Sequence, residues 1–159
     1  MRKFLAAMLC GILLIGSASC AMAQGIPCPE AHLILNVPDS WTSIPLYDSG
    51  DPDLCLLLES DDQTLSVYVS DAGGLIPGAF EVYTGDETES GTDFFSGVEM
   101  DYVYGKNSEG SYRIYTWFDS RNQIQLYFLI TGHTKSARKE IDKIMKTLNL
   151  NKPSPFPSL

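Results

Sequence analysis

Hydrophobic and polar residues alternate most clearly in the second half of the chain. Three segments there carry β-branched and aromatic residues at every second position, and a polar turn separates each segment from the next. A period of two with this composition is typical of β-strands, and short turns between strands favour an antiparallel meander. The predicted strands of the meander are Val98–Tyr104, Tyr112–Phe118 and Ile124–Ile130.

The first half of the mature chain predicts shorter extended elements. Leu54–Glu59 and Leu65–Ser70 flank the polar sequence Ser60–Gln63, which is the pattern of a β-hairpin. Asp71–Asp93 contains five glycines and only short apolar stretches, so we expect a long irregular excursion there, with at most one helical turn. Before the hairpin, the pattern predicts a proline-containing lead-in and two extended pieces, over Gln24–Glu30, His32–Val37 and Trp41–Leu46.

A single helix is predicted near the C-terminus, from an N-cap at Thr134 to Leu148. Its apolar residues fall at helical spacing and form one stripe, made of Ala137, Ile141, Ile144, Met145 and Leu148. The stripe should pack on the sheet. Asn151–Leu159 is rich in proline and is expected to be a loose tail. The predicted class is therefore α+β: an antiparallel sheet, built from the hairpin and the meander, with the C-terminal helix packed on it.

The first 23 residues read as a secretory signal peptide. Arg2 and Lys3 precede an apolar run, and the segment ends in Ala21-Met22-Ala23. The run is shorter than the roughly 20 residues that span a bilayer, and no second run qualifies, so no transmembrane segment is predicted. Removing residues 1–23 from 159 leaves 136 residues, with a single domain over 24–150 and the tail over 151–159. The expected location is periplasmic or extracellular.

A lipid anchor on Cys20 is the alternative to a soluble product. Bacterial lipoproteins are cut just before a lipid-modified cysteine. The triplet before Cys20 is Ser17-Ala18-Ser19, which lacks the apolar residue usual at such sites, whereas Ala21-Met22-Ala23 fits ordinary cleavage. A soluble chain that begins at Gln24 is therefore favoured.

Charge divides the mature chain into two unlike halves. Without the signal peptide, 9 bases stand against 20 acids, so the formal net charge changes from −9 to −11. Gln24–Asp101 holds sixteen acids and no base, and Tyr102–Leu159 holds four acids and nine bases. This balance excludes a nucleic-acid binder that relies on a basic surface. Either the basic helix lies against the acidic half within one fold, or part of the acidic half stays uncovered and binds cations or a basic partner.

Cys28 and Cys55 are the two cysteines of the mature chain. Two cysteines in an oxidising compartment most simply form a disulfide with each other. A metal pair or a redox pair is less favoured, because there is no Cys-x-x-Cys motif and His32 and His133 are the only histidines.

The sequence contains none of the common catalytic or nucleotide-binding motifs, such as Gly-x-Ser-x-Gly, His-Glu-x-x-His or a phosphate-binding glycine loop. No catalytic or cofactor-binding residue is predicted, and we expect a protein that is not an enzyme. His133, which follows Gly132 at a predicted strand–helix corner, is the one candidate around which an active site could form.

Two acidic segments are candidates for Ca²⁺, which takes about six to eight oxygen ligands. Neither follows the EF-hand order, and turn-forming Asp and Gly account for both without a metal. The candidate ligands are Asp48, Asp51, Asp53, Asp86, Glu89 and Asp93.

Two short motifs resemble the PsbP-like sandwich superfamily. Leu35–Trp41 reads Leu-Asn-Val-Pro-Asp-Ser-Trp and precedes the hairpin, and Phe95–Tyr102 reads Phe-Ser-Gly-Val-Glu-Met-Asp-Tyr and opens the meander. Ile144–Leu150 loosely matches the end of the family's closing helix. The resemblance covers most of Ala31–Leu150. It implies a PsbP-like α+β sandwich and a role in binding or assembly. Many relatives have a helix where this chain has the glycine-rich acidic stretch Gly73–Asp93.

Two hypotheses for function follow. The first is an exported, non-enzymatic binding or assembly protein of the bacterial envelope, whose partner is another envelope protein or a small ligand. Its contact surface would be the acidic excursion or the sheet aromatics Tyr68, Tyr115, Trp117 and Tyr127. The second is a small secreted hydrolase or ligand-processing enzyme with a site near His133.

Overall fold

The computed structural model describes residues 24–47, 50–71, 87–108, 110–132 and 138–149. These residues form nine strands followed by one helix. The elements are β1 (Gln24–Cys28), β2 (Leu33–Val37), β3 (Thr42–Ser43), β4 (Leu54–Glu59), β5 (Thr64–Asp71), β6 (Glu87–Phe95), β7 (Val98–Asn107), β8 (Gly110–Asp119), β9 (Ile124–Thr131) and α1 (Arg138–Lys146).

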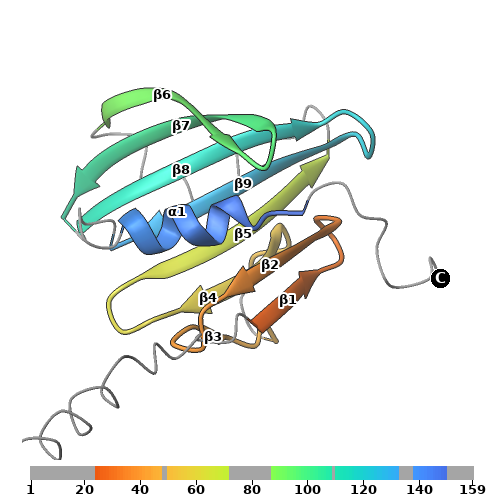
Figure 1. Ribbon diagram of the computed structural model, residues 1–159, viewed down its shortest axis with the longest axis horizontal. Helices are drawn as coiled ribbons and strands as arrows, with labels where there is room; N and C mark the ends of the chain where they lie inside the picture. The colour runs from red at the N-terminus through yellow and green to blue at the C-terminus, as the bar shows by residue number, and fades with distance from the viewer. Residues whose placement is uncertain (1–23, 48–49, 72–86, 109, 133–137, 150–159) are drawn as a thin grey trace, which may run out of the picture.

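Seven of the strands form one antiparallel sheet in the order β3-β4-β5-β9-β8-β7-β6 (Figure 1). Strand β9 pairs with β5 on one side and with β8 on the other, so it joins the β4–β5 hairpin to the meander β7–β8–β9. Strand β6 pairs with β7 and lies at one edge of the sheet. Strands β1 and β2 form a separate two-stranded hairpin.

The helix and the β1–β2 hairpin cover one face of the large sheet, which we call the inner face. Ile141, Ile144 and Met145 of α1 are buried in the same apolar cluster as side chains from β1, β2, β4, β5 and β7 to β9. The Thr147 hydroxyl, just after α1, accepts a hydrogen bond from the Asn36 amide at 3.1 Å, which ties the end of the helix to β2. The core therefore lies between the sheet and this second layer.

The opposite, outer face of the sheet carries a smaller buried cluster on its central strands. Its members are Tyr68, Tyr112, Ile114, Tyr127 and Leu129. Side chains alternate between the two faces along a strand. Buried side chains therefore lie on both faces of the central strands β5, β8 and β9, whereas the outer-face residues at the Phe94 end of β6 and β7, such as Thr92, Phe94, Glu99 and Asp101, are exposed.

The predicted hairpin, meander and helix are confirmed, and so is the α+β class. The apolar stripe of the helix is buried as expected, although Ala137 and the proposed N-cap Thr134 lie outside the described residues. Within Trp41–Leu46, only Thr42–Ser43 forms a strand. The predicted signal peptide (1–23) and the predicted C-terminal tail (151–159) also lie outside the described residues and stay predictions.

Two sequence predictions are wrong. The lead-in forms strand β1, because Ile26 and Cys28 alternate with exposed residues and Pro27 is tolerated on a strand of a two-stranded hairpin. The end of the predicted irregular excursion forms strand β6, and Ser96 and Gly97 connect it to β7 with φ values of 51° and 81°. Two consecutive residues at positive φ form the tight turn that suits a two-residue hairpin loop.

No helix among the described residues is long and apolar enough to cross a membrane.

Candidate functional site

Strand β6 is held to the sheet by a buried arginine on the inner face. Arg113 of β8 is only 1% exposed. Its Nη1 atom donates to Asp93 Oδ2 of β6 at 3.1 Å and to the Tyr115 hydroxyl at 3.2 Å. The Tyr115 hydroxyl in turn donates to Asp93 Oδ2 at 3.1 Å. This triad links β6 to β8 across the intervening strand β7.

Tyrosine rings surround the same guanidinium. Arg113 Cζ lies 4.2 Å from the centroid of the Tyr102 ring, 5.8 Å from that of Tyr104 and 5.7 Å from that of Tyr115. Such cation–π contacts stabilise a buried cation. Burial by itself lowers the pKa of Arg113, but the Tyr115 hydrogen bond and the nearby negative charge outweigh it, and the net pKa is raised.

The tip of this cluster reaches solvent through Glu89. The Tyr102 hydroxyl donates to Glu89 Oε1 at 2.6 Å, and this hydrogen bond is the main reason that the pKa of Tyr102 is raised. Gly91 lies opposite Tyr102 in the β6–β7 register. A Cβ atom at Gly91 would come within 3.1 Å of the Tyr102 hydroxyl, so glycine leaves the space that the ring occupies.

Alkaline pH should destabilise the protein through Tyr115. Burial raises the pKa of Tyr115 above its ordinary value of 10.0. The unfolded chain therefore loses this proton at lower pH than the folded chain, and stability falls as pH rises beyond 10.0. We expect the free energy of unfolding, measured with urea between pH 8 and 11, to fall less steeply with pH in Tyr115→Phe than in the wild type. The exposed Tyr47→Phe should keep the wild-type slope, and an equal slope in all three proteins would contradict the prediction.

The inner-face contacts of β6 force Phe94 outward. Asp93 is bound in the arginine triad, and Phe95 is buried with its ring edge-on to Tyr115 at 5.1 Å. Phe94, between them, therefore points to the outer face, where it is 66% exposed. It pairs with Glu99, which is also exposed.

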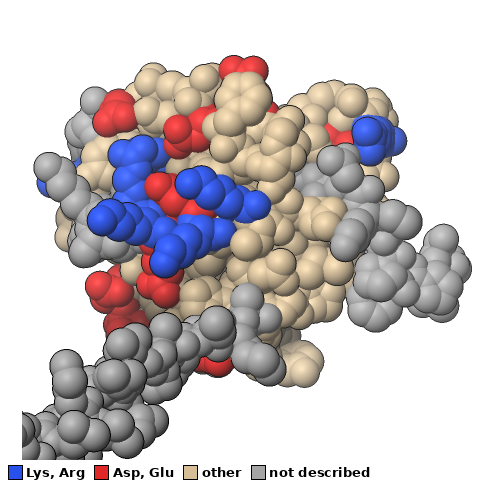
Figure 2. All heavy atoms as spheres, in the orientation of Figure 1, with Lys and Arg blue, Asp and Glu red and all other residues tan. Residues whose placement is uncertain are grey.

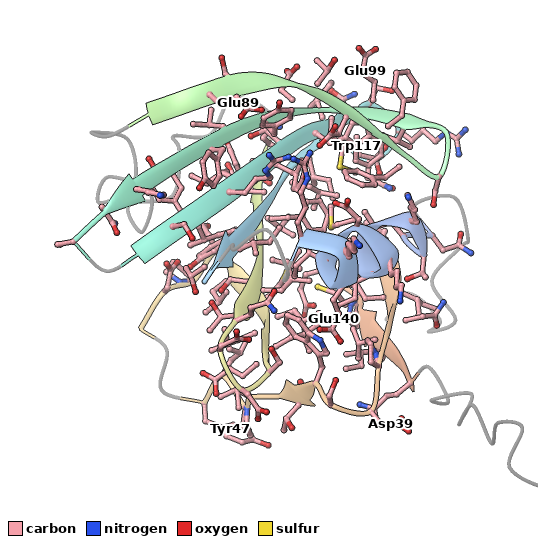
Figure 3. The ribbon with its side chains drawn as sticks, turned by 60° about the vertical axis from the view of Figure 1, so that its left-hand side comes forward. Asp39, Tyr47, Glu89, Glu99, Trp117 and Glu140 are labelled. Atoms are coloured by element: carbon pink, nitrogen blue, oxygen red, sulfur yellow. The ribbon has the colours of Figure 1, made fainter. Side chains whose placement is uncertain are left out.

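Phe118 of β8 extends this exposed surface. Asp101 pairs with Thr116, and Phe118 lies two residues beyond Thr116, so all three are on the outer face with Glu99 and Phe94. Phe118 is 44% exposed, and Asp101 is exposed. We call Phe94, Glu99, Asp101 and Phe118 the aromatic–acidic patch. Figure 3 shows Glu99 at the β6–β7 end of the molecule and Tyr47 at the opposite end.

The sheet aromatics predicted as a contact surface do not form one. Tyr68 and Tyr127 lie on the outer face, and both are buried. Tyr115 and Trp117 lie on the inner face, where Tyr115 is buried and Trp117 packs partly buried between the sheet and the helix (Figure 3). That prediction was wrong because alternation within a strand does not show whether the face is covered by another part of the fold.

The basic side chains of α1 lie at the surface, where Arg138 and Lys146 line a small pocket with Asp93 of β6. Arg138, Lys139, Lys143 and Lys146 are exposed and gather on the surface of the helix (Figure 2). Arg138 lies 4.0 Å from Asp142 of the same helix. Among the described residues, no base of α1 forms an ion pair with an acid of the first half. The helix is therefore docked by its apolar stripe rather than by charge.

The structure brings Cys28 and Cys55 together. Their Sγ atoms lie 2.9 Å apart, which is a contact between thiols and longer than the roughly 2.05 Å of a disulfide bond, so the bridge stays a prediction. The register of β4 against β5 shifts between Leu54 and Leu56, so Cys55 is the extra residue of a bulge. A bulge redirects a side chain, and here it turns Cys55 toward the inner core, where Cys28 of β1 lies.

The structure describes four of the six candidate calcium ligands, so the calcium site stays a prediction. Asp48 and Asp86 lie outside the described residues. Asp51 Oδ1 accepts the Asp53 amide at 3.1 Å, which is a local turn contact. Glu89 and Asp93 lie on strand β6 rather than on a loop, and each already accepts a hydrogen bond from a tyrosine. Within the described part of the chain, no group of three or more His, Cys, Asp or Glu side chains could hold a metal ion.

A cavity of about 350 Å³ lies beside Gly132 at the end of β9. His133, the candidate for an active site, follows Gly132 but lies outside the described residues. Among the described lining residues Asp62 is the one carboxylate, and there is no histidine, lysine or cysteine. The described lining therefore offers hydrogen-bonding groups but no pair of a nucleophile and a base.

Gly132 is a position where we expect alanine to be poorly tolerated. Its φ is +69°, and an added Cβ atom would collide with the backbone oxygen of Asp62 in the β4–β5 turn. The φ alone costs about 1–2 kcal/mol, and the collision adds to it. Gly50 has a similar φ of +66° with nothing near its Cβ position. Urea unfolding should show a larger loss in the free energy of unfolding for Gly132→Ala than for Gly50→Ala. Equal losses would contradict the close approach of the Asp62 backbone to Gly132.

Known structures share this architecture. No family model matches the chain, and no curated protein matches it in sequence. It is similar to the solution structure of cyanobacterial PsbP (CyanoP) from Synechocystis, with a TM-score of 0.56 and 12% identity over 84% of this chain and 95% of that one. A crystal structure from Bacteroides thetaiotaomicron aligns with a TM-score of 0.47 and 16% identity, over 82% of this chain and 49% of that one. The chain therefore has a PsbP-like fold, as the motifs at Leu35–Trp41 and Phe95–Tyr102 predicted.

Proposed function

We propose that this protein is an exported, non-enzymatic accessory protein that binds a basic protein partner through the aromatic–acidic patch. The observation that carries the proposal is the exposure of Phe94 and Phe118 on one sheet face beside two acids. Large exposed apolar side chains that share one surface are a mark of interaction sites. Aromatic residues are enriched in protein interfaces.

The patch is presented by rigid strands rather than by a loop. Phe94 lies between Asp93 and Phe95, which are fixed on the inner face by the arginine triad and by the core. A binding residue that is already ordered loses little conformational entropy when the partner arrives. The arginine triad thus has a positioning role for the surface.

Charge favours a basic partner. Glu99 and Asp101 belong to the patch, and the chain from Gln24 to Asp101 contains no base. Arg138 and Lys146 of α1 line a small pocket with Phe94 at the edge of the patch, but among the described residues neither forms an ion pair with Glu99 or Asp101. A basic partner would be attracted by this field and should dissociate more easily at high salt.

Two features support export to an oxidising compartment. Residues 1–23 have the pattern of a signal peptide. The fold also holds the two cysteines of the mature chain in contact, at positions 27 residues apart in sequence. A pair placed this way is suited to a structural disulfide, which persists outside the cytosol.

The test is capture of partners from an envelope extract of the host, with the protein expressed from its full sequence. We expect a basic protein that is retained at low salt and released at high salt. The double variant Phe94→Ser/Phe118→Ser should lose it, and Tyr47→Ser should retain it, because Tyr47 is 92% exposed but lies outside the patch. Equal capture by the double variant, or capture of acidic proteins only, would contradict the proposal.

A further inference from the structure

The cavity beside Gly132 has a floor of hydroxyl groups. Thr64 of β5 pairs with Thr131 of β9, and Thr131 pairs with Tyr112 of β8. Three neighbouring strands therefore present a hydroxyl-bearing residue in one row across the outer face. The hydroxyls of Thr64 and Thr131 are hydrogen-bonded to each other at 2.5 Å. One hydroxyl of that pair keeps its donor and both keep acceptor capacity, so the pair can still bind a polar ligand.

Two turns build the rim of the cavity. Asp62 comes from the β4–β5 turn, and Gly110 and Ser111 come from the start of β8. The Gly110 amide donates to Asn107 Oδ1 at 3.1 Å, which fixes the β7–β8 turn. The Ser60 amide donates to the Gln63 carbonyl at 2.9 Å, which closes the β4–β5 turn. Hydrogen bonds within the two turns therefore hold the rim, and its polar groups keep their spacing.

We propose that this cavity binds a neutral, polyhydroxylated small molecule of the sugar class. Its lining combines hydroxyls, one amide and one carboxylate, groups that can donate to and accept from ligand hydroxyls. Its volume is at the lower end of the range of about 300–1,000 Å³ for ligand sites, which suits a single small ring system. This site is separate from the aromatic–acidic patch and does not depend on it.

The lining argues against other classes of ligand. An anion would find no lysine, arginine or histidine among the described lining residues, and the Asp62 carboxylate would repel it. An apolar ligand would displace water from this polar lining without replacing the hydrogen bonds of that water, which costs free energy. A Ca²⁺ ion needs about six to eight oxygens, and Asp62 is the single charged side chain among the described lining residues.

The experiment is ligand-observed NMR followed by calorimetric titration of the full-sequence protein with glucose, galactose, N-acetylglucosamine and glucuronate. We expect at least one of the neutral sugars to bind in the millimolar range and glucuronate to bind more weakly. Thr64→Val/Thr131→Val keeps the shape of the floor but removes two hydroxyls, and it should weaken the neutral sugar by roughly tenfold or more. Thr92→Val, an exposed threonine on β6, is the matched control and should bind like the wild type.

Asp62→Asn provides a second test that does not depend on the threonines. It removes the negative charge and should narrow or abolish the discrimination against glucuronate while the neutral sugar still binds. The proposal is overturned if none of the neutral sugars binds, if the threonine double variant binds as well as the wild type while remaining folded, or if wild-type protein prefers glucuronate. These outcomes are independent of partner capture by the patch.

Discussion

Replacing Asp93 by alanine should lower the free energy of unfolding by at most about 3–5 kcal/mol, the range for breaking a fully buried ion pair, because the Asp93 side chain is 29% exposed. The reason is that Arg113 would remain as a buried charge without its carboxylate partner. Its guanidinium is 1% exposed and would retain only the Tyr115 hydroxyl and the tyrosine rings as partners among the described residues. The ring contacts offset part of the loss, so we expect a value in the lower part of this range.

Urea unfolding at neutral pH, followed by fluorescence of Trp41 and Trp117, measures this loss. Asp101→Ala is the matched control, because Asp101 is an exposed acid on the neighbouring strand β7 and faces away from Arg113. It should change stability by no more than about 0.5 kcal/mol. A loss below about 1 kcal/mol for Asp93→Ala would contradict a structural role for the pair.

A double variant separates charge from packing. Asp93→Leu/Arg113→Met removes both charges and retains much of the buried volume. Because apolar replacements of a buried ion pair are often neutral or stabilising, the double variant should recover most of the stability that Asp93→Ala loses. If it is as unstable as the single variant, the contribution of the cluster comes from hydrogen bonds and ring contacts rather than from the unpaired charge.

The sequence predicted best those elements whose burial follows a simple period. Strands β7, β8 and β9 carry apolar residues at every second position, and α1 carries its apolar stripe at helical spacing. These patterns arise because whole faces are buried by packing. The β4–β5 hairpin was predicted for the same reason, together with its polar turn.

Strand β6 was missed because its inner face is apolar only at Phe95 among the described side chains. Glu89, Gly91 and Asp93 occupy other inner-face positions, and each is suited to one local contact with Tyr102 or Arg113. A pattern based on hydrophobicity reads such a strand as a loop. The Ser96-Gly97 pair between Phe95 and Val98 was the signal that could have revealed the hairpin, since both residues suit a tight turn.

The arginine triad could have been suspected only in part. Arg113 shares a face with Tyr115 and Trp117, so a charged residue on an otherwise aromatic face was visible in the sequence. Its partner was not visible, because Asp93 is 20 residues away and its strand was not predicted. The polar cavity was hidden for a similar reason: Thr64, Thr131 and Tyr112 come together only through the β5–β9–β8 strand order.

Oxidation of Cys28 and Cys55 to a disulfide should stabilise the protein by about 3–4 kcal/mol relative to the reduced form, from closure of a loop of about 28 residues in the unfolded chain. The fold already holds the two sulfur atoms in contact at 2.9 Å, so little rearrangement is needed. Urea unfolding with and without reductant measures the difference. Cys28→Ala/Cys55→Ala is the control and should unfold identically in both conditions.

Titration of free thiols also tests the disulfide, and it must be made on unfolded, unreduced protein. Contact with Cys28, followed by burial, raises the pKa of the Cys55 thiol, so the reactive thiolate is disfavoured in the folded protein. Cys55 Sγ also donates to the Val67 carbonyl at 3.1 Å. Slow alkylation of the native protein would therefore be expected of buried thiols as well as of a disulfide. Protein exported by the host should show no free thiol after unfolding, and two free thiols would contradict both the bridge and the argument for export that rests on it.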